Sequence, residues 1–173
     1  KLLHLDHEVS QFYPKFTSIK KNKVTIRHLL THSSGLKAYV QYFKDERFKS
    51  KDDIIRDITE NQELSFEPGT DVVYSDLGMI LLMDIAEMVT NRTFSELADS
   101  WIFRPLNMNN STFTPSTDLF DRITPTEFDS LYRKQKIKGV VHDENSYLMG
   151  GISGHAGLFS NSHDIANFSQ MML

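Results

Sequence analysis

Residues 67–89 read Glu-Pro-Gly-Thr-Asp-Val-Val-Tyr-Ser-Asp, then Leu-Gly-Met-Ile-Leu-Leu-Met-Asp-Ile-Ala-Glu-Met-Val, and this stretch decides the fold. Pro68-Gly69 predicts a turn, and the β-branched and aromatic residues that end at Tyr74 predict a short extended piece. Ser75 can then cap a helix, with Asp76 in its first turn, where negative charge suits the helix dipole. The run behind it is apolar on most sides, which indicates a central helix with other elements packed around it.

Tyr74 therefore lies on a bend at the start of a buried helix, with its hydroxyl free to face a cleft. A phenol has an ordinary pKa of about 10 and is a poor base until a helix N-terminus or a nearby lysine lowers that pKa. Two interpretations stay open at this point. Tyr74 is either a half-buried tyrosine that closes the core or a strained functional position.

Composition narrows the classes of protein. The chain has 173 residues and a net charge of -4, with no basic block, which argues against a nucleic-acid partner. No stretch approaches the roughly 20 apolar residues that span a bilayer. Cysteine is absent, which excludes disulfides, thiol catalysis and cysteine-ligated metal sites. The absence of a starting Met and a final apolar run without a stop signal suggest an excised segment of a longer protein.

Helical patterns outnumber strand patterns, so a mainly α chain is expected. Capping residues predict where the helices begin, and Pro, Gly or Asn predict where several of them end. The expected helices are 5–13, a helix capped by Thr25 and closed by Gly35, 51–60 before Asn61, a helix after Thr93 that Pro105 stops, and 161–173. Residues 39–48 are also expected to be helical. Short strands are expected at 110–114 and 139–141, with a polar surface excursion at 116–138.

A glycine-rich segment is the second notable stretch. Four glycines between Gly150 and Gly157 predict unusual backbone angles or a close approach. Either a tight return beneath the core or a loop beside a ligand cleft would explain them. His142, Asp143 and His155 could be read as metal ligands, but their spacing matches no known zinc pattern. His28 and His32 are four apart, yet no Glu follows the first as a zinc-protease motif needs.

Several stretches taken together, in this order and spacing, resemble one family: the serine β-lactamase and DD-peptidase superfamily, in its class C-like esterase and penicillin-binding branch. The stretches are 24–36, the turn with Tyr74-Ser75-Asp76 and its apolar helix, 102–108 and 154–160. The resemblance implies the helical lobe of the β-lactamase/transpeptidase-like α+β fold, mainly α with few short strands. Residues 1–173 would then be a single helical subdomain, a truncated part of that domain.

The family's motifs supply the candidate site residues. Tyr74-Ser75-Asp76 matches Tyr-x-Asn with Asp in place of Asn, so Tyr74 and Asp76 are the expected catalytic residues. His155-Ala156-Gly157 fits His-x-Gly by letter, although it precedes a capped helix and the family's motif lies on a strand. Ser75, His155 and Gly157 are the expected substrate-binding residues. We assign no Ser-x-x-Lys motif within the chain and expect it to precede Lys1. No metal and no cofactor are expected.

The resemblance implies serine acyl transfer on a β-lactam, a D-alanyl peptide or an ester. The partners would be a small-molecule or peptidoglycan-derived substrate and the remainder of the same polypeptide, in the periplasm or outside the cell. The chain alone is expected to be inactive. Similar stretches also occur behind family 3 glycoside hydrolases, so such a fusion is a further expectation. The alternative is a non-catalytic helical module that binds peptidoglycan or a protein partner.

Overall fold

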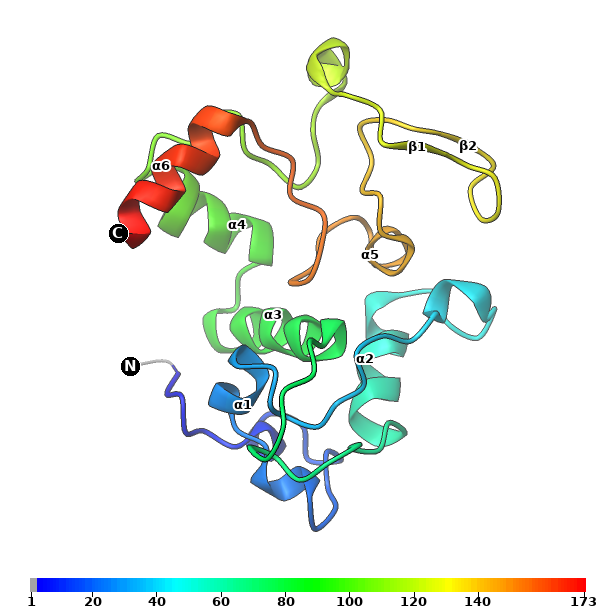
Figure 1. Cartoon of the computed structure of the whole chain (residues 1–173), viewed down its shortest axis with the longest axis vertical. Coiled ribbons are helices and arrows are strands. Elements are labelled where there is room, and N and C mark those ends of the chain that lie inside the picture. Colours follow the sequence, from blue (N-terminus) through cyan, green and yellow to red (C-terminus); the bar gives the residue numbers. More distant parts are fainter. Residues whose placement is uncertain (1–2) are drawn as a thin grey trace. The chain divides into compact units, whose positions relative to one another are not determined.

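A computed structural model describes residues 3–173, and the described part is mainly helical (Figure 1). The chain divides into two compact units, 1–91 and 92–173. The first unit contains α1 Ile26–Leu30, α2 Lys51–Glu60 and α3 Asp76–Thr90, with 3-10 turns η1 Val9–Gln11, η2 Lys21–Lys23 and η3 Tyr42–Lys44. The second contains α4 Phe94–Ala98, the π-helical turn η4 Asp99–Phe103, the 3-10 helix η5 Thr117–Arg122, strands β1 Glu127–Asp129 and β2 Gln135–Ile137, α5 Glu144–Leu148 and α6 Ser162–Met172. The prediction of a mainly α fold with few short strands is confirmed.

The predicted central helix of the first unit is α3. Ser75 caps it, and Asn91 ends it in the left-handed conformation at φ 52°. A Cβ on Gly78 would lie 3.7 Å from the Leu29 side chain of α1, so the glycine lets the two helices pack closely. The apolar side chains on its inner face are buried: Leu77, Ile80, Leu81, Met83 and Ile85. Removing this surface from water, at about 25 cal/mol per Å², is the main force that holds α3 in place.

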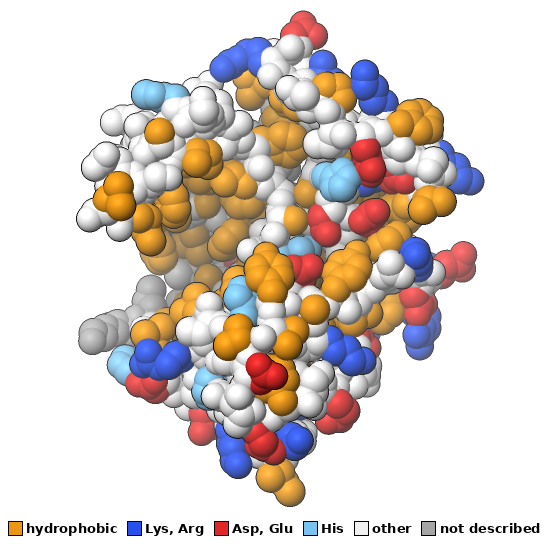
Figure 2. All heavy atoms as spheres, in the orientation of Figure 1, with side chains coloured by type: hydrophobic (Ala, Val, Ile, Leu, Met, Phe, Trp, Pro, Cys, Tyr) orange, Lys and Arg blue, Asp and Glu red, His pale blue; other side chains and the backbone are white. Residues whose placement is uncertain are grey.

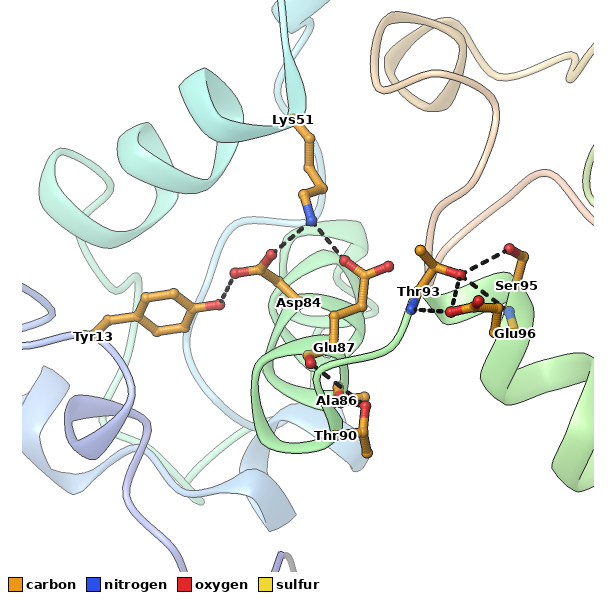
Figure 3. Close-up of polar contacts among 9 residues, drawn as sticks. All are labelled: Tyr13, Lys51, Asp84, Ala86, Glu87, Thr90, Thr93, Ser95 and Glu96. Atoms are coloured by element: carbon orange, nitrogen blue, oxygen red, sulfur yellow. Dashed lines mark hydrogen bonds and ion pairs between the residues drawn. The ribbon is translucent and has the colours of Figure 1, made fainter.

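An ion-pair network ties α2 to α3 (Figure 3). The Lys51 ammonium lies 3.0 Å from an Asp84 carboxylate oxygen and 2.6 Å from a Glu87 oxygen. Tyr13 donates its hydroxyl to the other Asp84 oxygen at 2.7 Å. Burial and the Asp84 charge raise the pKa of the Tyr13 phenol. Burial works against the charged Lys51, but its hydrogen bonds to Glu87 and Asp84 raise its pKa overall. The group therefore stays ionised and joins the two helices.

The end of α1 differs from the prediction. Thr25 caps this helix, and the His28 side chain completes a capping box. The left-handed residue that closes the helix is His32, at φ 56°, and not Gly35. His32 N–H donates to Leu29 O and Ser33 N–H donates to His28 O, which together form a Schellman motif. Gly35 is also left-handed, but it serves the next bend, where a Cβ would crowd the Phe66 carbonyl oxygen.

Two other predicted helices are wrong. Residues 5–13 form only the turn η1, because their backbone pairs with the first residues of α1: Ile26 N–H donates to His7 O and Arg27 N–H to Leu5 O. The aromatic segment 39–48 forms only the turn η3, in which Tyr42 is buried and donates to an Asp57 carboxylate oxygen at 2.9 Å. In both places tertiary contacts outweigh a weak local helical preference.

The second unit begins with the predicted capping box. The Thr93 hydroxyl oxygen accepts from Glu96 N–H, and the Glu96 carboxylate accepts from Thr93 N–H (Figure 3). The core behind α4 is a cluster of Ala98, Phe103, Met108 and Phe113, with Phe94, Ile102, Leu106, Ile152 and Phe168 packed against it. Outside that core, hydrophobic side chains gather on the surface over α4 and α6 (Figure 2). Trp101, Ile165 and Met172 are among the exposed apolar residues there.

The region predicted as an irregular excursion, 116–138, holds η5 and an antiparallel hairpin in which Glu127 pairs with Ile137. An ion pair with almost no exposed side-chain surface, Asp129–Arg133 at 2.7 Å, closes that hairpin. The predicted strands are wrong: 110–114 contributes one bridge, Thr112 with Phe159, and 139–141 begins at the left-handed Gly139 and forms no strand. Arg133 instead binds the carbonyls of that segment, through Val141 O and His142 O.

Candidate functional site

The first unit presents Tyr74 at the start of α3, as the sequence predicts. The turn before it is held where Gly69, at φ 84°, donates its N–H to Ser33 O at 2.8 Å. The next residues are exposed and make no strand, but Val73 N–H donates to His32 O at 3.0 Å. The Tyr74 side chain is 65% exposed. The interpretation of Tyr74 as a residue that closes the core is therefore wrong, and its phenol is accessible from solvent.

His32 is the residue that contacts this tyrosine. The centroids of the His32 and Tyr74 rings are 4.5 Å apart, with the ring planes tilted by 37°. On the other side of the tyrosine, Ser75 N–H donates to His32 Nδ1 at 3.1 Å. Sequence reasoning considered His32 only as a metal ligand or a satisfied helical histidine. Its place after α1 depends on a long-range return of the chain, which local patterns do not report.

Ser75 and Asp76 begin α3. The Ser75 hydroxyl accepts from Gly78 N–H at 3.2 Å and donates to Lys37 O at 2.7 Å. Ser75 is 1% exposed, so its hydroxyl belongs to the cap, and its predicted contact with a substrate stays a prediction. Asp76 N–H donates to Ala38 O at 2.9 Å. Its half-buried side chain lies in the first helical turn, where the helix dipole favours a carboxylate.

The second unit holds His155 and Gly157, the other predicted site residues. The His155 side chain is 2% exposed and lies between Asp143 Oδ1, at 3.0 Å from Nε2, and Ser153 Oγ, at 2.7 Å from Nδ1. Burial tends to raise the pKa of the Asp143 carboxyl, but hydrogen bonds from His155 and from Ser146 N–H lower it below its ordinary value. This hydrogen-bonded chain fixes the glycine segment to the start of α5.

Gly157 has a backbone that other residues rarely adopt. Its φ is 115°, and a Cβ there would overlap the Gly151 carbonyl oxygen. Gly157 and Asp143 both line a hollow of about 570 Å³ in the second unit. His155 does not line this hollow but binds Asp143, which does. The segment therefore makes a tight return and borders a hollow at Gly157, and its place beside a ligand stays a prediction.

The residues weighed as metal ligands do not gather. His142 Nε2 lies 3.0 Å from Glu127 Oε1, whereas His155 pairs with Asp143. Within residues 3–173, no group of three or more His, Asp and Glu side chains is placed to hold a metal ion. The same part of the chain contains no helix with the length and apolar character that crossing a membrane requires.

The pattern Ser-x-x-Lys does occur within the chain, contrary to the prediction from the sequence. They occur at Ser18–Lys21 and at Ser34–Lys37. Lys21 is 1% exposed and donates its ammonium to Thr59 O, and Ser18 Oγ accepts from the Lys21 backbone N–H. Ser34 is 1% exposed and its hydroxyl accepts from Leu36 N–H, in the loop after α1. Neither pair offers an accessible hydroxyl beside an ammonium.

Comparisons with known proteins agree with the motifs. A sequence model of the Beta-lactamase family matches residues 1–173. A protein of Escherichia coli K12 named "Putative D-alanyl-D-alanine carboxypeptidase" is 34% identical over 194 residues, covering 99% of this chain and 45% of that protein. One of the same name from Salmonella typhimurium LT2 is 31% identical, covering 95% and 44%. This chain thus spans less than half the length of these relatives.

Solved structures share the fold. A β-lactamase/D-alanine carboxypeptidase from Pseudomonas syringae superposes with a TM-score of 0.74 at 19% identity, over 98% of this chain and 44% of that one. A penicillin-binding protein homologue from Pyrococcus abyssi superposes with a TM-score of 0.71 at 23% identity, over 98% and 39%. With the family match over its whole length, the chain belongs to the β-lactamase family of serine hydrolases and DD-peptidases.

Proposed function

We propose that this chain carries the acid–base side of a serine acyl-transfer site, with Tyr74 as the proton-transfer residue and Asp76 as its partner. The observation that supports this most is the accessible Tyr74 phenol, 65% exposed yet held on both sides at the start of α3. An exposed tyrosine without a function would need no such support. The nucleophilic serine and its lysine come from a part of the polypeptide outside these residues.

The reaction is an acyl transfer through a covalent intermediate. The serine oxygen bonds to the substrate carbonyl carbon, and Tyr74, acting as a phenolate, takes the serine proton. The phenol then gives this proton to the leaving nitrogen as the carbon–nitrogen bond breaks. Water attacks the resulting ester by the same route, which releases the acid and restores the serine. In this scheme Tyr74 is the only group of the chain that must move a proton.

Asp76 stands where the family has Asn. A carboxylate near the phenol disfavours the phenolate unless a cation compensates for it. We assign that compensation to the lysine of the Ser-x-x-Lys motif, which Asp76 would pair with and orient. Replacing Asp76 with Asn should then weaken the hold on the lysine without removing the proton-transfer group. A lower kcat at unchanged chain stability is the expected result, and unchanged kcat would exclude the pairing.

D-Alanyl peptides are the substrate class we propose. The supporting observation is that the two relatives described above, at 34% and 31% identity, are each named "Putative D-alanyl-D-alanine carboxypeptidase". A peptidoglycan-derived substrate places the protein in the periplasm or outside the cell. β-Lactams and simple esters present a similar reactive carbonyl and serve as chromogenic probes. His155 and Gly157 are proposed to border the substrate through the segment that lines the hollow in their unit.

The test is Tyr74→Phe in a polypeptide that carries both this chain and a Ser-x-x-Lys motif. Turnover of nitrocefin and of a D-alanyl-D-alanine peptide should fall by about 10²-fold or more, because phenylalanine keeps the ring and removes the transferable proton. Tyr147→Phe is the matched control, since Tyr147 is 39% exposed in the second unit and has no proposed part in the reaction. Equal turnover by Tyr74→Phe and the control would exclude the role of Tyr74.

A second experiment tests where the nucleophile lies. Residues 1–173 alone should hydrolyse neither nitrocefin nor a p-nitrophenyl ester, because neither Ser18 nor Ser34 combines an accessible hydroxyl with a neighbouring ammonium. Stoichiometric acylation of the isolated chain by a labelled penicillin would contradict this. If the polypeptide contained no other Ser-x-x-Lys, a non-catalytic module that binds peptidoglycan would replace the enzyme proposal, and sedimentation with purified peptidoglycan would detect it.

A further inference from the structure

One residue contacts the chain on both sides of the proposed acid–base tyrosine. His32 accepts from Val73 N–H through its carbonyl oxygen at 3.0 Å and from Ser75 N–H through Nδ1 at 3.1 Å. Between these two bonds, its ring lies against the Tyr74 ring at 4.5 Å between centroids. Each of these contacts joins residues more than 40 positions apart in the sequence, so none is a by-product of local structure.

The backbone of His32 makes this arrangement informative. His32 occupies the left-handed position of the Schellman motif that ends α1, at φ 56°. Glycine is the usual residue there because it has no Cβ to strain, and Asn is the usual alternative. Histidine is one of the few other residue types enriched in this conformation. Unlike glycine, it brings a ring to this position, and that ring accepts from Ser75 N–H and lies against the Tyr74 ring.

The hydrogen bond also sets the form of the ring. Because His32 Nδ1 accepts from Ser75 N–H, the ring is neutral and its proton is on Nε2. The ring is thereby fixed in rotation, since turning it would replace the acceptor with carbon. A fixed ring against Tyr74 limits the rotamers that this mostly exposed side chain can adopt. An exposed tyrosine would otherwise populate several rotamers.

We propose that His32 is the positioning residue for Tyr74: it orients the phenol for proton transfer and does not itself react. This inference rests on the proposed function only for its catalytic consequence, because the orientation of the ring is measurable without turnover. Misplacing a reacting group by about 1 Å can lower a rate by about 10²-fold. Removing the His32 side chain should therefore lower kcat more than it changes KM.

The chain permits two informative variants. His32→Gly keeps the left-handed backbone and removes the side chain, so the fold should be retained. His32→Asn also tolerates this backbone, and its carbonyl oxygen can accept from Ser75 N–H, but it has no ring. His163→Asn is the matched control, because His163 is exposed in the second unit. Melting temperature and far-UV circular dichroism verify that each variant is folded.

The first readout is NMR of ring-labelled tyrosine in residues 1–173, with the Tyr74 signal assigned by its loss in Tyr74→Phe. In the unsubstituted chain the Tyr74 ring should show NOEs to the His32 ring and a ring-current shift. Both should disappear in His32→Gly and in His32→Asn and persist in His163→Asn. A Tyr74 ring with unchanged shifts in His32→Gly would overturn the positioning role, whatever the activity of the protein.

The second readout is kinetic, in the polypeptide that carries Ser-x-x-Lys. We expect kcat to fall by about 10-fold or more in His32→Gly with a smaller change in KM, and to recover partly in His32→Asn. If Tyr74→Phe is impaired while His32→Gly keeps full kcat, the inference fails and the proposed function stands. If Tyr74→Phe is unimpaired, the proposed function fails, and the NMR result alone decides whether His32 orients the ring.

Discussion

Replacing Ser75 with alanine removes two hydrogen bonds at the start of α3. The first, from Gly78 N–H to the hydroxyl, is the N-cap, and losing such a cap destabilises a protein by about 1 kcal/mol. The second runs from the hydroxyl to Lys37 O, which the variant leaves without this donor, at about 1 kcal/mol more. The free energy of unfolding should therefore fall by about 2 kcal/mol.

Thermal and urea unfolding of Ser75→Ala would measure this. In a chain of this size, about 2 kcal/mol corresponds to a melting temperature roughly 4–8 °C lower. Thr93→Ala is the matched control, since Thr93 caps the exposed start of α4 and its hydroxyl donates to an exposed Glu96 carboxylate that water can solvate, so it should lose only about 1 kcal/mol. A loss below about 0.5 kcal/mol in Ser75→Ala, joined to a raised KM in the enzyme, would refute the cap reasoning and restore Ser75 as a substrate contact.

Three other changes test the remaining contacts. Lys51→Met should lower the free energy of unfolding in urea by about 2 kcal/mol, because Asp84 and Glu87 would lose the cation between them. An unchanged free energy of unfolding would mean that water already solvates the two carboxylates. Gly157→Ala should destabilise by about 2 kcal/mol or more, because its φ is 115° and the Cβ would meet a carbonyl oxygen; a folded, equally stable variant would contradict this. The folded-state pKa of Asp143 is lowered, so the stability that its carboxylate contributes is present above about pH 4 and is lost as the pH falls through that pKa. The difference in unfolding free energy between the unsubstituted chain and Asp143→Asn should therefore shrink on acidification. A difference that stays constant with pH would exclude this contribution.

Local signals predicted much of the fold. Thr25, Ser50, Thr93 and Asn161 each cap the helix that the sequence placed after them, because a side-chain oxygen that accepts from the third N–H needs only neighbours in sequence. The central helix α3 followed from its apolar run. The position of Tyr74 at the start of α3 followed from the turn before it and the cap after it, whereas the sequence left its exposure open.

The predictions that were wrong concern residues whose structure depends on contacts with distant parts of the sequence. The backbone at 5–13 bonds to the start of α1, and the hairpin at 127–137 is closed by a buried ion pair inside a polar segment that shows little alternation. His32 ends α1 in the left-handed conformation and contacts a tyrosine 42 positions later in the sequence. Periodicity and propensity contain no information on such pairings, so the contact of His32 with the candidate site could not be predicted from the sequence.

The hydrogen bonds that hold Tyr74 come from one short stretch of the first unit, so a neighbouring stretch can change in length without affecting them. His32, directly after α1, accepts from Val73 N–H and Ser75 N–H. Lys37 O and Ala38 O accept further bonds from the Ser75 hydroxyl and from Asp76 N–H. The exposed turn at Glu46–Arg47 takes no part in these hydrogen bonds. An insertion there would lengthen the surface turn and leave the hydrogen bonds around Tyr74 unbroken.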